Sequence, residues 1–354
     1  MRYRTLGATG LTVSEIGFGT IPILAGDAPV LPSYRSPDPE TAVSIMRSAY
    51  DMGCNLFDTA AYDEYGDAEY KLGLFAARVP RETIILSDKA RKYTGSEMRN
   101  AVLASCDRLG ARPDIYFVHQ VDERNADVVF SKGGALDALC ELKREGLIRF
   151  TGVASHYYAT LERAALDPRV DVLQMSGNIL ERGMLERMKD NRALVEKGVI
   201  LNKVYAAGLL LQDYTPAELI GGILRYPISS ALIGVGTFEE AKAAMRQEYL
   251  PNEIPFEDVF RYLSRNYDLV KCDRCQRCVC RRRHELHSVV RYFNYMKLGK
   301  TEWAKRHLRM YLSKIQKHCA ACPDAPCVSS CPRNLSLPDI VELIAESLEN
   351  DSER

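Results

Sequence analysis

The sequence predicts an α/β protein: a closed (β/α)8 barrel, the TIM-barrel fold, followed by a small, mainly helical domain. Apolar runs that end in a polar residue alternate with helical stretches over roughly the first two-thirds of the chain. The 354 residues are enough for one large and one small domain. Eight of the 11 cysteines fall between Cys272 and Cys331, where the composition changes. We therefore expect a barrel at residues 1–265 and a second domain at residues 266–354.

The first elements are a β-hairpin and a strand. Tyr3 to Ser14 has two short strand-like runs around Gly7-Ala8-Thr9-Gly10, a turn composition. Ile16 to Thr20 follows as the first barrel strand, and its glycines allow a ligand or a neighbouring backbone to come close. Pro39 to Met52 repeats its apolar residues with the period of a helix.

Strands and helices then alternate. The later strand-like runs end near Asp58, Lys89, His119, Ser155, Ser176, Asn202 and Gly234. Helical stretches between them are Gly95–Leu109, Ala135–Glu145, Tyr158–Ala165, Met184–Lys197 and Glu239–Met245. With the run that ends at Gly19-Thr20, this makes eight strands, which fits a parallel barrel. A doubly wound open sheet is the alternative, but no Gly-x-Gly-x-x-Gly follows the first strand.

The overall composition favours no macromolecular partner. Lys+Arg and Asp+Glu both total 47, so the formal net charge is zero. No basic-then-apolar leader opens the chain, and no apolar run approaches membrane-spanning length. We therefore expect a soluble, cytoplasmic protein that binds no membrane.

Three predicted strands end in side chains suited to proton transfer. Leu56-Phe57 runs into Asp58, and the next two strands end in Lys89 and His119, with Tyr65 on the first connecting loop. Barrel enzymes carry their active sites at the C-terminal ends of the strands, so we expect the site there. The alternative is a set of satisfied core groups and surface charges. Four such residue types at successive strand ends make that alternative weaker.

Several motifs in fixed order resemble the aldo-keto reductase family. They are the opening Arg4–Ser14, Phe57-Asp58-Thr59-Ala60 with Tyr65-Gly66, Lys89, Asp114–His119 and Gly152–His156. The resemblance implies an NAD(P)-dependent oxidoreductase that reduces a small-molecule carbonyl compound, an aldehyde or a ketone, to an alcohol. It also implies a catalytic tetrad of Asp58, Tyr65, Lys89 and His119.

The chemistry of carbonyl reduction agrees with these roles, because hydride transfer needs a proton delivered to the carbonyl oxygen. A free tyrosine has a pKa of about 10, and the Lys89 ammonium, held by Asp58, would favour the phenolate. His119 would donate to the carbonyl oxygen or orient the substrate. We choose Tyr65 over Tyr62 because the residues after Tyr65 continue the family pattern, with a two-residue insertion before it.

The resemblance implies that NAD(P) is bound by Gly19, Thr20, Asp58, Ser155, Gln174 and Gly234. Gln174 would bind the carboxamide, and the backbone near Gly234 would approach the phosphates. For the glycines, a simple turn is the alternative. Where the family often has a basic residue for the 2′-phosphate of NADP, this chain has Gly236. We therefore expect weak discrimination between NAD and NADP.

The cysteine-rich segment has the spacing of iron–sulfur ligands. Cys272-x2-Cys275-x2-Cys278, Cys319-x2-Cys322 and Cys327-x3-Cys331-Pro332 resemble a two-cluster bacterial-type ferredoxin, and some aldo-keto reductases carry such a domain. The resemblance implies a ferredoxin-like domain with [4Fe–4S] clusters, two or only one, for electron transfer or for structure. Cys272, Cys275, Cys278 and Cys331 would hold one cluster, and Cys280, Cys319, Cys322 and Cys327 the other. We expect helices at 284–297 and 301–317 between the two groups of cysteines.

Structural zinc is the alternative for these thiolates. Arginines are interleaved with these cysteines. They could form a docking patch for an acidic electron carrier or for nucleic acid. We favour the alternative, in which they compensate the negative charge of the clusters locally. Two other functions remain: a non-catalytic module that senses nicotinamide, and a zinc-stabilised nucleic-acid-binding protein. The polar strand ends argue against the first, and a brown protein would argue against the second.

Overall fold

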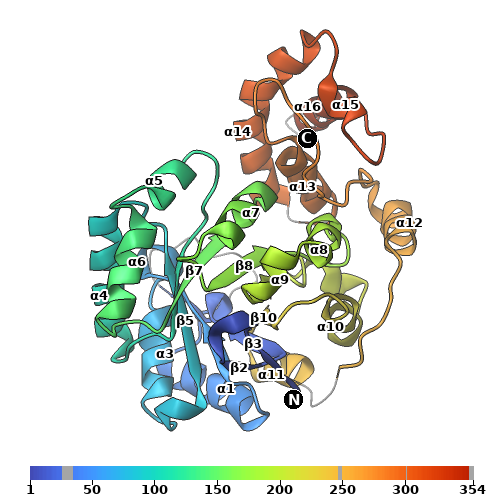
Figure 1. Cartoon of the computed structure of the whole chain (residues 1–354). Coiled ribbons are helices and arrows are strands. Elements are labelled where there is room, and N and C mark those ends of the chain that lie inside the picture. Colours follow the sequence, from blue (N-terminus) through green and yellow to red (C-terminus); the bar gives the residue numbers. More distant parts are fainter. Residues whose placement is uncertain (26–34, 246–248, 300, 351–354) are drawn as a thin grey trace. The chain divides into compact units, whose positions relative to one another are not determined.

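The computed structural model describes residues 1–25, 35–245, 249–299 and 301–350 (Figure 1). The chain divides into two compact units. The barrel unit comprises Met1–Gly177 and Met188–Asn252, and the helical unit comprises Asn178–Arg187 and Glu253–Arg354.

Eight parallel strands, counted over the described residues, close a barrel in the order β10-β3-β4-β5-β6-β7-β8-β9. They are β3 (Ile16–Gly19), β4 (Leu56–Asp58), β5 (Ile85–Ala90), β6 (Ile115–Val118), β7 (Phe150–Ser155), β8 (Val172–Ser176), β9 (Val199–Asn202) and β10 (Ser230–Gly234). The barrel closes where β10 pairs with β3, with Gly234 opposite Gly19. The predicted (β/α)8 barrel is confirmed, and the open doubly wound sheet is excluded.

The opening hairpin packs against one end of the barrel interior. β1 (Tyr3–Thr5) and β2 (Thr12–Ser14) pair antiparallel, as predicted. Leu6, Leu11 and Val13 of the hairpin share an apolar cluster with the first residues of several strands, including Leu56 and Ile115. Apolar packing therefore fills the N-terminal end of the barrel, and the polar strand ends lie at the other.

Helices surround these strands (Figure 1). They are α1 (Pro39–Asp51), α2 (Tyr62–Tyr65), α3 (Ala68–Ala76), α4 (Gly95–Leu109), α5 (Ala126–Phe130), α6 (Ala135–Arg144), α7 (Tyr158–Leu166), α9 (Arg192–Glu196), α10 (Pro216–Leu224) and α11 (Phe238–Ala244). Helix α8 (Gly183–Lys189) begins in the segment 178–187 that belongs to the helical unit. The stretch predicted as one helix, Met184–Lys197, is wrong as a single element, because the Asn191 side chain caps α9 by accepting from the Leu194 N–H. Helices α2, α3, α5 and α10 were not predicted.

The helical unit contains α12 (Phe256–Tyr267), α13 (Leu286–Lys297), α14 (Thr301–Ala320), α15 (Pro326–Ser329) and α16 (Leu337–Asn350). It begins at Glu253 rather than near residue 266, because Glu257 of α12 pairs with Lys271 and, at 2.7 Å, with Arg333. Segment 178–187 joins it through the Gly183 N–H, which donates to the Asp273 carbonyl at 2.7 Å. None of the described helices is long and apolar enough to cross a membrane.

Candidate active site

Asp58 and Lys89 form a buried ion pair at the C-terminal ends of β4 and β5. Lys89 Nζ donates to Asp58 Oδ2 and, at 2.6 Å, to the carbonyl oxygen of Thr59. Asp58 Oδ1 accepts from Ser87 Oγ at 2.7 Å and from Gln174 Nε2 at 3.0 Å. Three side-chain donors therefore share one carboxylate, and the ammonium group is held at a fixed position.

Tyr65 lies beside this ion pair, with its ring centroid 5.3 Å from Lys89 Nζ. Its side chain is half-buried, whereas Tyr62, on the same turn of helix, is 47% exposed. Burial raises the pKa of the Tyr65 phenol above its usual value of about 10, and nearby carboxylates raise it further. The direction is opposite to the lowering expected from Lys89, because burial is the largest effect and the Asp58 and Glu64 carboxylates add to it. The phenol stays protonated near neutral pH, as a proton donor requires.

His119 follows β6 and contacts Glu64, a residue that was not selected from the sequence. Its Nδ1 lies 2.5 Å from Oε2 of buried Glu64. Glu64 also accepts from the Arg91 backbone N–H at 2.8 Å and pairs with Arg91 Nε at 2.9 Å. Burial lowers the pKa of His119, although the Glu64 hydrogen bond opposes this effect. The signal that could have identified Glu64 is the insertion before Tyr65, which places an acid directly next to the tyrosine.

A small cavity of about 10 Å³ opens among the strand ends. It is lined by His119, Gln120, Ala154, Ser155, His156, Gln174 and Asn202. Ser155 Oγ donates to the Val121 carbonyl at 2.6 Å, and Asn202 Nδ2 lies 3.4 Å from Gln174 Oε1. Across the described residues, the buried Asn202 Oδ1 meets no hydrogen-bond donor. The cavity therefore contains a hydrogen-bond acceptor without a donor, and a ligand amide or hydroxyl group can donate to it.

The predicted phosphate-binding glycines lie together on neighbouring strands. Gly19 pairs with Gly234, and a Cβ added at Gly234 would lie 3.0 Å from Pro22 Cγ. The Gly236 N–H donates to Glu240 Oε2 at 2.7 Å, and a Cβ at Gly236 would lie 3.1 Å from Arg35 Cγ. Neither Glu240 nor Arg35 was selected from the sequence. An acidic and a basic side chain therefore both lie close to Gly236, at a position where the sequence analysis had identified only the glycine.

The predicted residue Thr20 lies between these glycines and the ion pair. Its backbone N–H donates to the Asp58 carbonyl at 2.9 Å. Its hydroxyl is buried and, within the part of the chain that the structure describes, has no hydrogen-bond partner. A polar ligand atom would satisfy it.

In the helical unit the cysteines fall into two groups. Cys272, Cys275, Cys278 and Cys331 line a cavity of about 20 Å³. Burial and the nearby Cys280, Cys327 and Cys322 together raise the pKa of the Cys319 thiol to about 11. In the described parts of the chain, no three His, Cys, Asp or Glu side chains lie close enough to hold a single metal ion.

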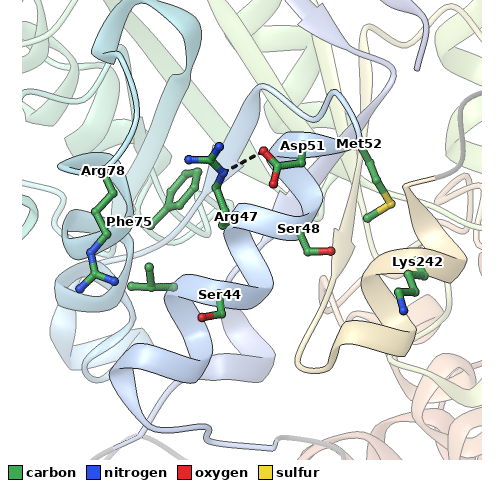
Figure 2. A pocket seen from close by; sticks show the side chains of 9 residues that line it. Ser44, Arg47, Ser48, Asp51, Met52, Phe75, Arg78 and Lys242 are labelled. Carbon is green, nitrogen blue, oxygen red and sulfur yellow. Dashed lines mark hydrogen bonds and ion pairs between the residues drawn. The ribbon is translucent and has the colours of Figure 1, made fainter.

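A groove of about 530 Å³ lies away from the strand ends, between α1, α3 and α11 (Figure 2). Arg47 pairs with Asp51 at 2.8 Å, and Arg78 with Glu40 at 2.7 Å. Figure 2 shows Lys242 of α11 on the opposite side of α1 from Phe75 and Arg78. Both arginine charges are matched by acids, so this groove lacks the acid–base arrangement of the strand ends.

Several known proteins are similar to this chain in sequence. A model of the aldo/keto reductase family matches residues 15–219. D-threo-aldose 1-dehydrogenase from Pseudomonas sp. is 23% identical over 313 residues, which cover 70% of this chain and 92% of the relative. The NADH-specific methylglyoxal reductase of Escherichia coli is 26% identical over 243 residues, covering 61% and 72%. L-galactose dehydrogenase of Arabidopsis thaliana is 34% identical over 161 residues, covering 42% and 47%.

Solved structures are also similar to this chain. A putative aldo-keto reductase from Pseudomonas aeruginosa has a TM-score of 0.58 and 27% identity, covering 69% of this chain and 94% of that structure. The family match spans more than half of the 354 residues. This chain therefore belongs to the aldo/keto reductase family and is an NAD(P)H-dependent oxidoreductase.

Proposed function

We propose that the barrel unit interconverts a carbonyl compound and an alcohol by hydride transfer, with Tyr65 as the proton donor. The observation that carries this proposal is the fixed Lys89 ammonium, bound to Asp58 and 5.3 Å from the Tyr65 ring. The phenol keeps its proton until negative charge develops on the substrate oxygen. Lys89 then stabilises the phenolate that remains. Bound nicotinamide supplies the hydride.

The residues at the strand ends fit a nicotinamide cofactor. The unsatisfied Asn202 Oδ1 can accept from the carboxamide, beside Gln174, for which the sequence predicted this role. The buried Thr20 hydroxyl and the close-packed backbone at Gly19 and Gly234 are suited to the polar remainder of the molecule. Ser155 supports the cavity wall through its hydrogen bond to Val121.

A carbonyl screen tests this function. Reduced nicotinamide is mixed with the protein and a panel of aldehydes and ketones that includes methylglyoxal and small sugars, the compounds in the relatives' names. We expect loss of reduced nicotinamide in equal amount to the alcohol formed. Tight nicotinamide binding with no carbonyl consumed across the panel would instead support a non-catalytic sensing module.

We propose a modest preference for NAD over NADP. Glu240, anchored on the Gly236 N–H, places a carboxylate where a 2′-phosphate would need a donor, and Arg35 beside it offsets part of the repulsion. We expect Glu240→Gln to tighten NADP binding by about fivefold or more and to leave NAD binding unchanged. Fluorescence titration of both cofactors measures this. Glu239→Gln, an exposed neighbour on α11, is the matched control, and an equal gain there would contradict the assignment.

We propose that the two cysteine groups each hold a [4Fe–4S] cluster. Two observations support this: the four thiols around one cavity, and the mutual proximity of the other four. Cys331 lies with the first run of cysteines and Cys280 with the second, the crossed arrangement of two-cluster ferredoxins. A zinc ion bound by four thiolates per site is the alternative, and metal and sulfide analysis distinguishes the two.

We propose that the clusters mainly stabilise the helical unit. A hydride carries two electrons and a [4Fe–4S] cluster accepts one, so the cluster does not exchange directly with nicotinamide. The nearby basic residues are partly compensated, since Arg281 pairs with Asp324 and Arg274 lies 3.5 Å from Glu181. Exposed Arg277, Arg282 and Arg283 remain available to an acidic electron carrier.

Cys275→Ala tests the clusters. Anaerobically purified protein should be brown and carry about eight iron and eight sulfide per chain. The variant should lose most of this iron together with the helical signal of the helical unit, with aldehyde reduction largely retained. Cys140→Ala, a lone thiol of the barrel unit, should change neither. Stoichiometric zinc without sulfide would contradict the clusters, and a folded variant without turnover would place them in the catalytic cycle.

A further inference from the structure

Segment 178–187, which follows β8 in the chain, is held by the cysteine loop, residues 272–278. Arg187 Nη1 donates to the Cys275 carbonyl oxygen at 3.0 Å. A Cβ added at Gly183 would lie 2.6 Å from both the backbone nitrogen and the Cα atom of Cys275. That distance is too short for any side chain, so the backbones of the segment and the cysteine loop are in direct contact there.

A buried charge holds the same segment at a second point. Glu181 is 4% exposed, and its Oε1 lies 3.1 Å from Arg291 Nε of α13. Its Oε2 lies 3.5 Å from Nη1 of Arg274, which is itself part of the cysteine loop. A buried carboxylate is strongly unfavourable without its cations, so Glu181 stays with these two arginines. The segment is therefore fixed only while the cysteine loop and α13 keep their positions.

The conformation of the cysteine loop fits a bound anionic cluster. Arg274 and Gln276 both have φ of 58°, the left-handed region that residues with a Cβ rarely adopt. Each lies between two cysteines of the loop. Turns of this kind can direct backbone N–H groups toward a common anion. A cluster held by these thiolates would stabilise an otherwise unfavourable loop conformation, and its loss would release the loop.

The segment begins directly after the last barrel contact of β8. The Gly177 N–H donates to the Asn202 carbonyl oxygen at 3.0 Å, and Asn178, the next residue, already belongs to the helical unit. Asn202 ends β9, and β8 carries Gln174, the two residues proposed to bind the nicotinamide carboxamide. Any displacement of segment 178–187 therefore acts on Gly177 through a single peptide bond.

We propose that segment 178–187 couples the first cysteine group to the nicotinamide site, so that a cluster bound there tightens nicotinamide binding and nicotinamide protects the cluster. This inference rests on the proposed function and adds a mode of regulation to it. Binding at two coupled sites is reciprocal, and we expect a coupling factor of about fivefold. Turnover at saturating nicotinamide should persist without the cluster, because Asp58, Tyr65 and Lys89 lie outside the segment.

Loss of the cluster from the unmodified, full-length protein tests the coupling. Anaerobic protein is mixed with excess ferrous-iron chelator, and the visible absorption of the clusters is followed with and without saturating NAD. NAD is used because it carries no hydride and cannot reduce the clusters. We expect NAD to slow the loss of absorption about fivefold, because it lowers the population of the opened segment. Equal rates would overturn the proposal.

Gly183→Ala interrupts the proposed route without changing a cysteine. Its Cβ displaces the segment from the Cys275 backbone, so the Kd for NAD should rise about fivefold and the protection by NAD should disappear. Asp190→Ala, at an exposed position just past the segment, is the matched control and should change neither. Full protection in Gly183→Ala, or an equal loss in Asp190→Ala, would contradict the role of the segment.

Hydrogen exchange of the unmodified protein gives a readout that depends on no variant. NAD should slow exchange in peptides covering 178–187 while the clusters are present, and should not do so after the chelator has removed them. Exchange that is indifferent to NAD in the brown protein would overturn the coupling.

The outcomes separate this inference from the proposed function. A colourless protein without sulfide would overturn the clusters, and a protein that binds no NAD would overturn the nicotinamide site. A brown protein that binds NAD but loses its clusters at the same rate with and without it would overturn the coupling alone.

Discussion

Tyr65→Phe is expected to lower kcat for carbonyl reduction by roughly a hundredfold or more, because it removes the proton donor and leaves the ring in place. The phenol is the group beside the fixed Lys89 ammonium, and its raised pKa keeps it protonated. Nicotinamide binding should be unchanged, since the ring volume is conserved. Single-turnover kinetics measure the chemical step, and fluorescence titration measures cofactor binding.

Tyr62→Phe is the matched control for this prediction. Tyr62 opens the same short helix and carries the same hydroxyl group, but its side chain is exposed. Its loss should leave kcat within a factor of about two, as expected of a surface substitution. Full activity in Tyr65→Phe combined with loss in Tyr62→Phe would show that the other tyrosine is the donor.

Lys89→Met is expected to cost both stability and activity. The substitution leaves the Asp58 carboxylate buried without its cation, a change that costs about 3–5 kcal/mol in buried ion pairs. It also removes the charge that stabilises the Tyr65 phenolate, so reduction should fall at least as far as in Tyr65→Phe. Urea unfolding and steady-state kinetics measure the two effects.

The double variant Lys89→Met/Asp58→Asn separates these two effects. Removing both charges eliminates the unpaired carboxylate, so most of the lost stability should return. Activity should not return, because the cation is still missing. A double variant as unstable as the single one would mean that packing, rather than the ion pair, explains the loss.

Local signals explain which elements of the fold were predictable. Helix α4 matches its predicted bounds because Thr94 and Glu97 form a capping box at its start and Gly110 adopts a left-handed conformation after its end. The barrel strands were predictable because each apolar run stops at a polar or small residue. Segment 178–187 was not, because it joins the helical unit through Glu181, which pairs with Arg291 at 3.1 Å, more than a hundred residues away. No local sequence pattern indicates a contact between residues so far apart in the chain.

In the candidate site, too, the sequence predicted the residues but not all of their contacts. The strand-end positions of Asp58, Lys89 and His119 followed from sequence pattern, and the structure brings Asp58 and Lys89 into direct contact. The Glu64–His119 hydrogen bond joins residues 55 positions apart and was not foreseen. The direction of the Tyr65 pKa shift also needed the structure, because it depends on burial and on the nearby Asp58 and Glu64 carboxylates. Spacing identifies candidate residues, but only their contacts reveal protonation states.

The measurement that tests the central claim most directly is deuterium transfer from nicotinamide. Reduced cofactor deuterated at the C4 position of the transferred hydride is incubated with the anaerobic protein and an aldehyde that the screen identifies, and the alcohol is analysed by mass spectrometry. Direct hydride transfer in the barrel predicts one deuterium on the carbinol carbon of each product molecule, and no labelled product from Tyr65→Phe on the same time scale. Nicotinamide oxidation that yields unlabelled alcohol would contradict the account, because the electrons would then have travelled by another route.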